Sequence, residues 1–149
     1  MAQQGDKMPK RKYSYNTQYV SKRATRYVNR DDKRYDRYVK YKERHGFSPD
    51  ECWNLDETLV EFLLPRLRYF RNHTIGYPSS IKTFEEWTAI LDKIIWSFEE
   101  KLRCGGLTDT AEFYKGVSHK EGERRLQEYR DRYREGLDLF GEWWCALWW

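Results

Sequence analysis

The sequence predicts an all-α protein, a compact bundle of four main helices preceded by a flexible basic N-terminal arm. Apolar residues recur at helical spacing in four stretches. Three of these stretches begin with a Ser or Thr three positions before a Glu, which is the capping-box pattern of a helix start. No segment alternates apolar and polar residues over the length of a strand. Because 149 residues are the length of one ordinary domain, we expect a single helical domain over residues 17–149 after an arm of residues 1–16.

The N-terminal third of the chain is strongly basic. Residues 1–46 contain 14 Lys or Arg against 5 Asp or Glu, whereas the remaining residues contain 14 against 19. Residues 1–16 have no apolar period and include Gly5, Pro9 and the cluster Lys10-Arg11-Lys12, a composition typical of a flexible arm. Residues 17–46 then predict a basic, Tyr-rich helix that His45-Gly46 closes.

This first helix is expected to have two distinct faces. One face is apolar and consists of Val20, Ala24, Tyr27, Val28, Tyr35, Tyr38 and Val39. The opposite face carries six cations at spacings of 4 and 3 residues, namely Arg26, Arg30, Lys33, Arg37, Lys40 and Arg44. On one continuous helix these cations form a stripe over about five turns, roughly 27 Å long.

Ser48 and Glu51 open a second predicted helix, which runs to about Arg71. Its apolar residues spread around more than half of the circumference, so we expect it to be the central helix of the core. Pro65 should kink this helix near Glu61, or split it there, because proline lacks the amide donor and clashes with the previous turn.

Thr83 and Glu86 open a third helix, which ends at Cys104 before two glycines. Its residues form one clean apolar stripe, namely Phe84, Trp87, Ile90, Leu91, Ile94, Ile95, Phe98 and Leu102. After a loop with a short helical turn, Ser118 and Glu121 open the last helix. This helix places one apolar face along Leu126, Tyr129, Tyr133, Leu137, Phe140, Trp144 and Leu147.

A cluster of tryptophans ends the chain. One helix face cannot bury the rings at positions 143, 144, 148 and 149, because Trp149 lies roughly 140° around the helix from Trp144. Either neighbouring helices cover both sides, or an aromatic patch remains exposed as a surface for a partner or a second copy of the chain. The candidate interface residues are Tyr77, Trp96, Trp143, Trp144, Trp148 and Trp149.

The sequence contains no pattern that carries enzymatic or metal chemistry. His45, His73 and His119 are widely separated, and the three cysteines have no CxxC spacing, so we expect free thiols, no metal site and no cofactor. Phosphate-binding glycine loops and nucleophile motifs are also absent. No apolar run approaches the roughly 18 residues of a membrane span. We therefore expect a cytoplasmic protein that is not an enzyme and has no membrane partner.

The basic stripe is the feature that points to a ligand. Cations that reach successive phosphates together bind polyanions, and aromatic rings beside them stack on unpaired bases. The N-terminal arm supplies both kinds of group, namely Lys10, Arg11, Lys12, Tyr13 and Tyr15, and Tyr19 follows shortly after it. These residues and the stripe predict a site for nucleic acid or another anionic ligand. Two alternatives stay open at this stage: a solvated charged face with no ligand, and an acidic protein partner.

One combination of motifs resembles a known group of proteins. It comprises Trp53-Asn54-Leu55-Asp56, Gly76-Tyr77-Pro78, Phe84-Glu85-Glu86-Trp87, Ile90 to Ile95, and Gly136-Leu137 followed by Leu147-Trp148. Over about residues 50–149 the chain resembles small uncharacterised proteins encoded by tailed bacteriophages and prophages. The resemblance implies a phage accessory protein acting in the cytoplasm of a bacterial host, and it supplies no activity. Such a protein can bind nucleic acid, or it can inhibit or sequester a host protein or an anionic nucleotide signal through an aromatic surface. A virion component is a further alternative.

Overall fold

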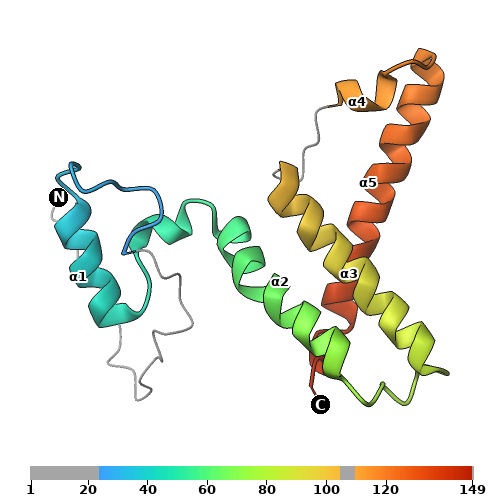
Figure 1. The fold of residues 1–149 in the computed structure, drawn as a ribbon, viewed down its shortest axis with the longest axis horizontal. Coiled ribbons are helices and arrows are strands. Elements are labelled where there is room, and N and C mark those ends of the chain that lie inside the picture. Colours follow the sequence, from blue (N-terminus) through green and yellow to red (C-terminus); the bar gives the residue numbers. More distant parts are fainter. Residues whose placement is uncertain (1–23, 105–109, 149) are drawn as a thin grey trace, which may run out of the picture. The chain divides into compact units, whose positions relative to one another are not determined.

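The computed structural model describes residues 24–104 and 110–148 (Figure 1). In these residues every regular element is a helix and none is a strand, which confirms the all-α class. The chain divides into two compact units, Met1–Trp53 and Asn54–Trp149. The predicted arm, residues 1–16, lies outside the described part of the chain.

The first unit contains helix α1 (Tyr35–His45) and the 3-10 helix η2 (Pro49–Cys52). Helix α1 ends as the sequence predicts: Gly46 adopts a left-handed φ of 85°, and its N–H donates to the carbonyl of Lys42 at 2.7 Å. Its start differs from the prediction. The helix expected over residues 17–46 begins only at Tyr35, so the prediction is wrong for residues 24–34.

A distant carboxylate explains why the chain is not helical at residues 26–28. The backbone N–H groups of Arg26, Tyr27 and Val28 all donate to Oδ2 of Asp50, at 2.9, 2.7 and 3.0 Å. In a continuous helix these donors would bond to carbonyls four residues earlier. The Thr25 hydroxyl in turn donates to the carbonyl of Val28 at 2.6 Å, which is one of the acceptors that a helix would use. Contacts from a later segment therefore override the local helical pattern.

The second unit contains α2 (Leu55–His73), α3 (Phe84–Cys104), α4 (Ala111–Tyr114), α5 (His119–Glu142) and the 3-10 helix η3 (Trp144–Ala146). Helix α3 packs against both α2 and α5, and α4 packs against α5 (Figure 1). The buried core consists of Val60, Leu64, Leu67, Ile81, Trp87, Leu91, Ile94, Ile95 and Phe98. Most of these residues belong to α3, so α3 is the central helix, and the expectation that the second helix holds this place is wrong.

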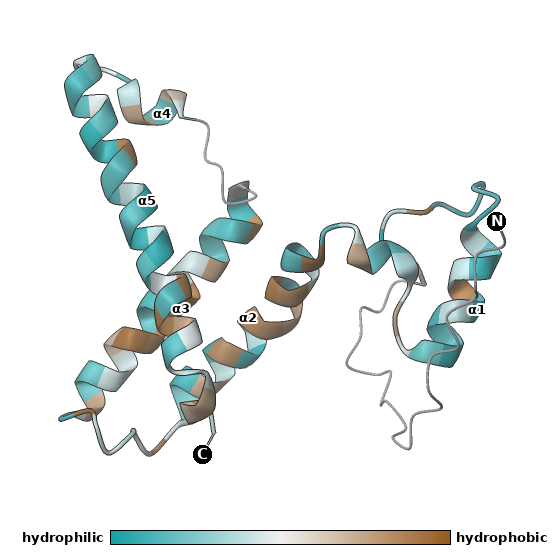
Figure 2. Cartoon of the chain, turned by 180° about the vertical axis from the view of Figure 1, so that it is seen from behind, coloured by the Kyte–Doolittle hydropathy of each residue, from teal (hydrophilic) through white to brown (hydrophobic). Residues whose placement is uncertain are grey.

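Helix α2 has an exposed apolar side, which explains why its sequence looked like that of a central helix. Leu55, Leu59 and Phe62 are all exposed although they are large and apolar. Figure 2 shows apolar residues along much of α2, whereas α5 is hydrophilic over most of its length. Helix α2 continues through Pro65 without interruption, so the predicted split does not occur.

The predicted helix starts at Thr83 and Ser118 are confirmed. The Thr83 hydroxyl accepts the N–H of Glu86 at 3.1 Å, and the Ser118 hydroxyl accepts the N–H of Glu121 at 3.3 Å. The Ser48 signal is real but marks a shorter element. There the Glu51 carboxylate accepts the N–H of Ser48 at 3.1 Å, and the element that follows is the single turn η2.

Helices α3 and α5 approach closely at Ser97 and Gly136. The Ser97 hydroxyl donates to the carbonyl of Tyr133 at 3.0 Å. A Cβ atom placed on Gly136 would lie 2.5 Å from the carbonyl oxygen of Lys93 and closer still to the Ser97 hydroxyl. The missing side chain of Gly136 therefore permits this contact between the two helices.

Candidate functional site

The first unit presents a group of exposed cations, which we call the cationic surface. It consists of Arg30, Lys33, Arg37, Lys40 and Arg44. Among the described residues none of the five takes part in an ion pair. Arg37, Lys40 and Arg44 share one face of α1, over a length of roughly 10 Å.

The predicted stripe of six cations along one helix is wrong, because α1 begins after three of its members. Arg26, Arg30 and Lys33 lie on the irregular segment before the helix. Arg26 is also half-buried, and its Nε donates to the hydroxyl of Tyr27 at 2.7 Å. The arm residues of the predicted site lie outside the described part of the chain, namely Lys10, Arg11, Lys12, Tyr13 and Tyr15, and so does Tyr19.

Several acids of the first unit are engaged inside the unit. Asp32 accepts Nε and Nη2 of Arg34 at 2.9 and 2.6 Å, and hydrogen bonds from the side chain and then the backbone of Arg34 lower the pKa of Asp32 to about 2. Glu51 is buried and pairs with Nζ of Lys42 at 2.8 Å. Asp50 is also buried, and its carboxylate accepts the backbone N–H groups of residues 26–28. The acids of residues 24–53 that remain exposed are Asp31, Asp36 and Glu43.

Asp50 is the structural centre of the first unit. The Ser48 hydroxyl donates to its Oδ1, while Oδ2 takes three backbone donors. Burial raises the pKa of Asp50, but the bond from Ser48 and those from the backbone outweigh this effect, so the pKa lies below its ordinary value. A charged carboxylate therefore holds the chain before α1 against the segment after it.

Two aromatic rings lie together on the surface of this unit. Tyr27 and Trp53 stack with ring centroids 5.9 Å apart and planes only 4° from parallel. The guanidinium carbon of Arg26 lies 5.2 Å from the Tyr27 ring centroid, and that of Arg34 lies 5.4 Å from the Trp53 ring centroid. The side chains remain accessible, at 40% for Tyr27 and 51% for Trp53. We call this pair the Tyr27–Trp53 stack.

The pattern of the sequence did not reveal this stack. It placed Tyr27 on the apolar face of a long helix and gave Trp53 no role at a site. The two rings are brought together by the hydrogen bond between Asp50 and the backbone of Tyr27, which are 23 positions apart. A pattern of local spacing in the sequence cannot predict such a long-range bond.

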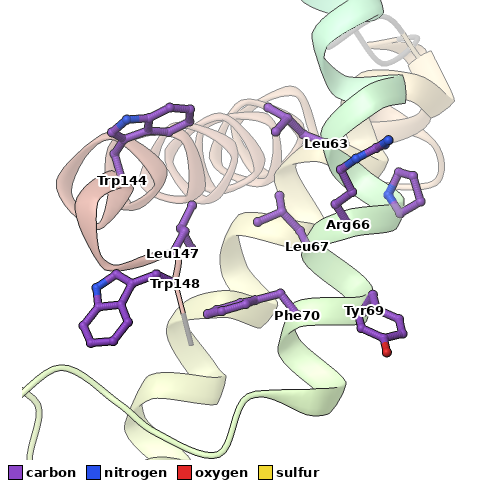
Figure 3. Close-up of a pocket in the computed structure, with 9 residues that line it drawn as sticks. Leu63, Arg66, Leu67, Tyr69, Phe70, Trp144, Leu147 and Trp148 are labelled. Atoms are coloured by element: carbon purple, nitrogen blue, oxygen red, sulfur yellow. The ribbon is translucent and has the colours of Figure 1, made fainter. Parts of the chain in front are cut away.

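The second unit contains an apolar groove between α2 and the C-terminal residues (Figure 3). Its volume is about 660 Å³, and its lining consists of Leu63, Pro65, Arg66, Leu67, Tyr69, Phe70, Trp144, Leu147 and Trp148. Trp144 and Trp148 are 57% and 74% exposed. The size and the lining are those of ligand-binding or peptide-binding pockets.

Of the predicted interface residues that the structure describes, Trp144 and Trp148 line this groove. Helix α5 ends at Glu142, so the terminal tryptophans do not continue it as predicted. Trp143 instead packs on the buried Trp87, with ring centroids 5.6 Å apart.

The other predicted interface residues lie elsewhere. Trp96 faces α5, where the guanidinium carbon of Arg132 lies 3.8 Å from its ring centroid and Tyr129 makes an edge contact. Tyr77 is exposed beside Phe84, and Trp149 is outside the described residues.

Within residues 24–104 and 110–148, no group of three or more His, Cys, Asp or Glu side chains is placed to hold a metal ion. Cys52 and Cys145 are exposed free thiols, as predicted for these two residues. No helix in the described ranges is long and apolar enough to cross a membrane. No protein-family model, curated protein or solved structure matches this chain. The two surfaces are therefore interpreted from the chemistry of their own residues.

Proposed function

We propose that this protein is a non-enzymatic binding protein that engages nucleic acid through the cationic surface of its first unit. One observation carries the proposal. Five exposed cations make no ion pair among the described residues, while Asp32, Asp50 and Glu51 of the same unit are engaged internally. The positive charge that remains at the surface favours a polyanion, because each neutralised phosphate releases condensed counterions.

The distribution of charge between the two units supports the same ligand. Residues 1–53 contain 14 Lys or Arg against 7 Asp or Glu, and residues 54–149 contain 14 against 17. A polyanion is therefore attracted to the first unit and repelled by the average charge of the second. The face of α1 spans roughly 10 Å, which corresponds to about three nucleotides of one strand at roughly 3.4 Å each.

Charge reversal on α1 tests the proposal. The variant that combines Arg37→Glu, Lys40→Glu and Arg44→Glu should lose binding to labelled oligonucleotides in a mobility-shift titration at low salt. For the wild type, the logarithm of the affinity should fall linearly with the logarithm of the salt concentration, by roughly 0.7 to 0.9 for each phosphate contact.

A matched control separates the site from total charge. Lys120, Arg130 and Arg134 are exposed cations of α5, and changing all three to Glu alters the net charge by the same amount. This variant should still bind. Equal loss in both triple variants, or unchanged binding in the α1 variant, would contradict the proposal.

A second candidate function is the inhibition or sequestration of a protein partner through the apolar groove. The observation that favours it is the high exposure of Trp144 and Trp148 on the wall of that groove, because exposed clustered rings are typical of interaction surfaces. Under the phage resemblance, the partner would be a host factor. A stoichiometric partner that resists nuclease and is lost when Trp144 and Trp148 are changed to Ala would support this function. Capture that nuclease abolishes would contradict it.

A further inference from the structure

We infer that the Tyr27–Trp53 stack is a platform for an unpaired base, so that the first unit binds single-stranded nucleic acid in preference to duplex. The inference rests on the proposed function and specifies its ligand. It assigns the recognition of bases to two residues outside the cationic surface.

The geometry of the two rings is suitable for stacking on a base. Tyr27 and Trp53 are parallel within 4° with centroids 5.9 Å apart, so the rings pack on each other and the outward face and edge of each ring are what a base can reach. Roughly half of the Trp53 side chain is accessible to solvent. Bases stack on such rings regardless of sequence, because every base has a π face.

Arginines flank the stack at both ends. The Arg26 guanidinium lies over Tyr27, and the Arg34 guanidinium lies over Trp53. Arg34 also immediately follows Lys33 in the chain, and Tyr27 stands three residues before Arg30. The stack thus lies within a few residues of Arg30 and Lys33 along the chain, so a strand stacked on it can also reach cations that bind its phosphates.

The platform is held in place before any ligand arrives. Asp50 accepts the N–H of Tyr27 on its carboxylate at 2.7 Å, and its carbonyl accepts the N–H of Trp53 at 3.3 Å. One residue therefore fixes the backbone of both ring-bearing positions, and little conformational entropy is lost when a base binds. Asp50 acts here as a positioning residue.

The first unit is expected to prefer a single strand over a duplex because only unpaired bases expose their faces. In an intact duplex the bases are paired and stacked on one another, so the platform cannot reach a base face. A duplex can use only the phosphate contacts of the cationic surface, whereas an unpaired strand can use both the phosphate contacts and the stack.

The test compares a single strand and a duplex of the same sequence in mobility-shift titrations with the full chain. Trp53→Ala should weaken binding of the single strand by roughly 5- to 150-fold, the effect of removing one stacking ring. Binding of the duplex should not change. Trp53→Phe retains a ring and should keep most of the affinity for the single strand. Trp148→Ala removes an exposed tryptophan of the second unit and should affect neither ligand.

Two further variants keep the test decisive if Trp53→Ala disturbs the fold. Trp53→Leu keeps apolar bulk without a π face, and Tyr27→Leu keeps the backbone bond to Asp50. Both should lose affinity for the single strand while circular dichroism shows native helix content.

The outcomes separate this inference from the proposed function. If the wild type binds neither oligonucleotide, the proposed function fails. If the wild type binds both, and the ring variants reduce the two affinities equally or not at all, the stack is only internal packing. In that case the inference is overturned while the proposed function stands.

Discussion

The Asp50 carboxylate and the Tyr27 backbone N–H, 23 positions apart in the sequence, form a hydrogen bond of 2.7 Å. The same oxygen accepts the N–H groups of Arg26 and Val28. A single side chain therefore replaces the helical hydrogen bonds that these residues would otherwise make. The irregular backbone at residues 26–28, which carries the Tyr27 ring, is held by it.

Replacement of Asp50 by Ala should destabilise the first unit by about 3 kcal/mol or more. Three backbone donors and the Ser48 hydroxyl would lose a charged acceptor, and an unsatisfied buried donor costs about 1–3 kcal/mol. Hydrogen exchange is the direct measurement, because the amides of Arg26, Tyr27 and Val28 should lose their protection.

Asp36→Ala serves as the control for that prediction. Asp36 is an exposed acid on α1, and its removal should change the free energy of unfolding by no more than about 0.5 kcal/mol. Equal protection of the three amides in the Asp50→Ala variant and the wild type would show that the bonds to Asp50 do not hold this segment.

The stability of the first unit should depend on pH in the acid range. The pKa of Asp50 is lowered in the folded state, so the unfolded chain takes up the proton first as the pH falls. The stabilisation is therefore fully present above the unfolded pKa of about 3.9 and is lost as the pH falls through the folded pKa. Amide protection at residues 26–28 should accordingly be constant near neutral pH and decline below about pH 4. Protection that rises on acidification would contradict this sign.

Two glycines of α5 should respond in opposite directions to replacement by Ala. Gly136→Ala places a methyl group against the Lys93 carbonyl and the Ser97 hydroxyl, and should destabilise the second unit by about 1–3 kcal/mol. Gly141 has no heavy atom within 4 Å of an added Cβ, so Gly141→Ala should stabilise α5 by up to about 1 kcal/mol. Urea denaturation followed by circular dichroism measures both changes, and a neutral Gly136→Ala would refute the close contact.

The tryptophans of the second unit should differ sharply in their contribution to stability. Trp87 is almost fully buried, so Trp87→Ala should cost about 3–5 kcal/mol through lost burial and a cavity. Trp148 is mostly exposed, and Trp148→Ala should change the free energy of unfolding by about 0.5 kcal/mol or less. A large cost at Trp148 would mean that its ring belongs to the core and is not available to a partner.

Local patterns in the sequence were sufficient to predict α3 and the start of α5. Thr83 and Ser118 cap these helices as predicted, and the stripe from Trp87 to Phe98 supplies most of the buried core. Both signals act over one to a few helical turns, so periodicity and capping chemistry capture them.

Long-range contacts determine the structure of the segments that the sequence pattern predicted wrongly. The predicted stripe of cations was too long because the first helix does not include residues 26–28. Their backbone N–H groups donate to Asp50, more than 20 positions away, and not to helical carbonyls. The predicted tryptophan face failed because α5 ends at Glu142 and the Trp143 ring turns onto Trp87. The sequence pattern also missed the stacking of Tyr27 on Trp53, since Asp50 bonds the backbone N–H of both residues although they are 26 positions apart.

Trp53 is the single tryptophan of residues 1–53, and the other six belong to residues 54–149. Subtracting the emission spectrum of a Trp53→Phe variant from that of the wild type therefore gives the contribution of Trp53, the one tryptophan of the first unit. Because the Tyr27 ring lies 5.9 Å away, excitation of that tyrosine should pass efficiently to Trp53 while the stack is intact. The chain thus carries its own optical probe, which reports on the order of the first unit without an added dye.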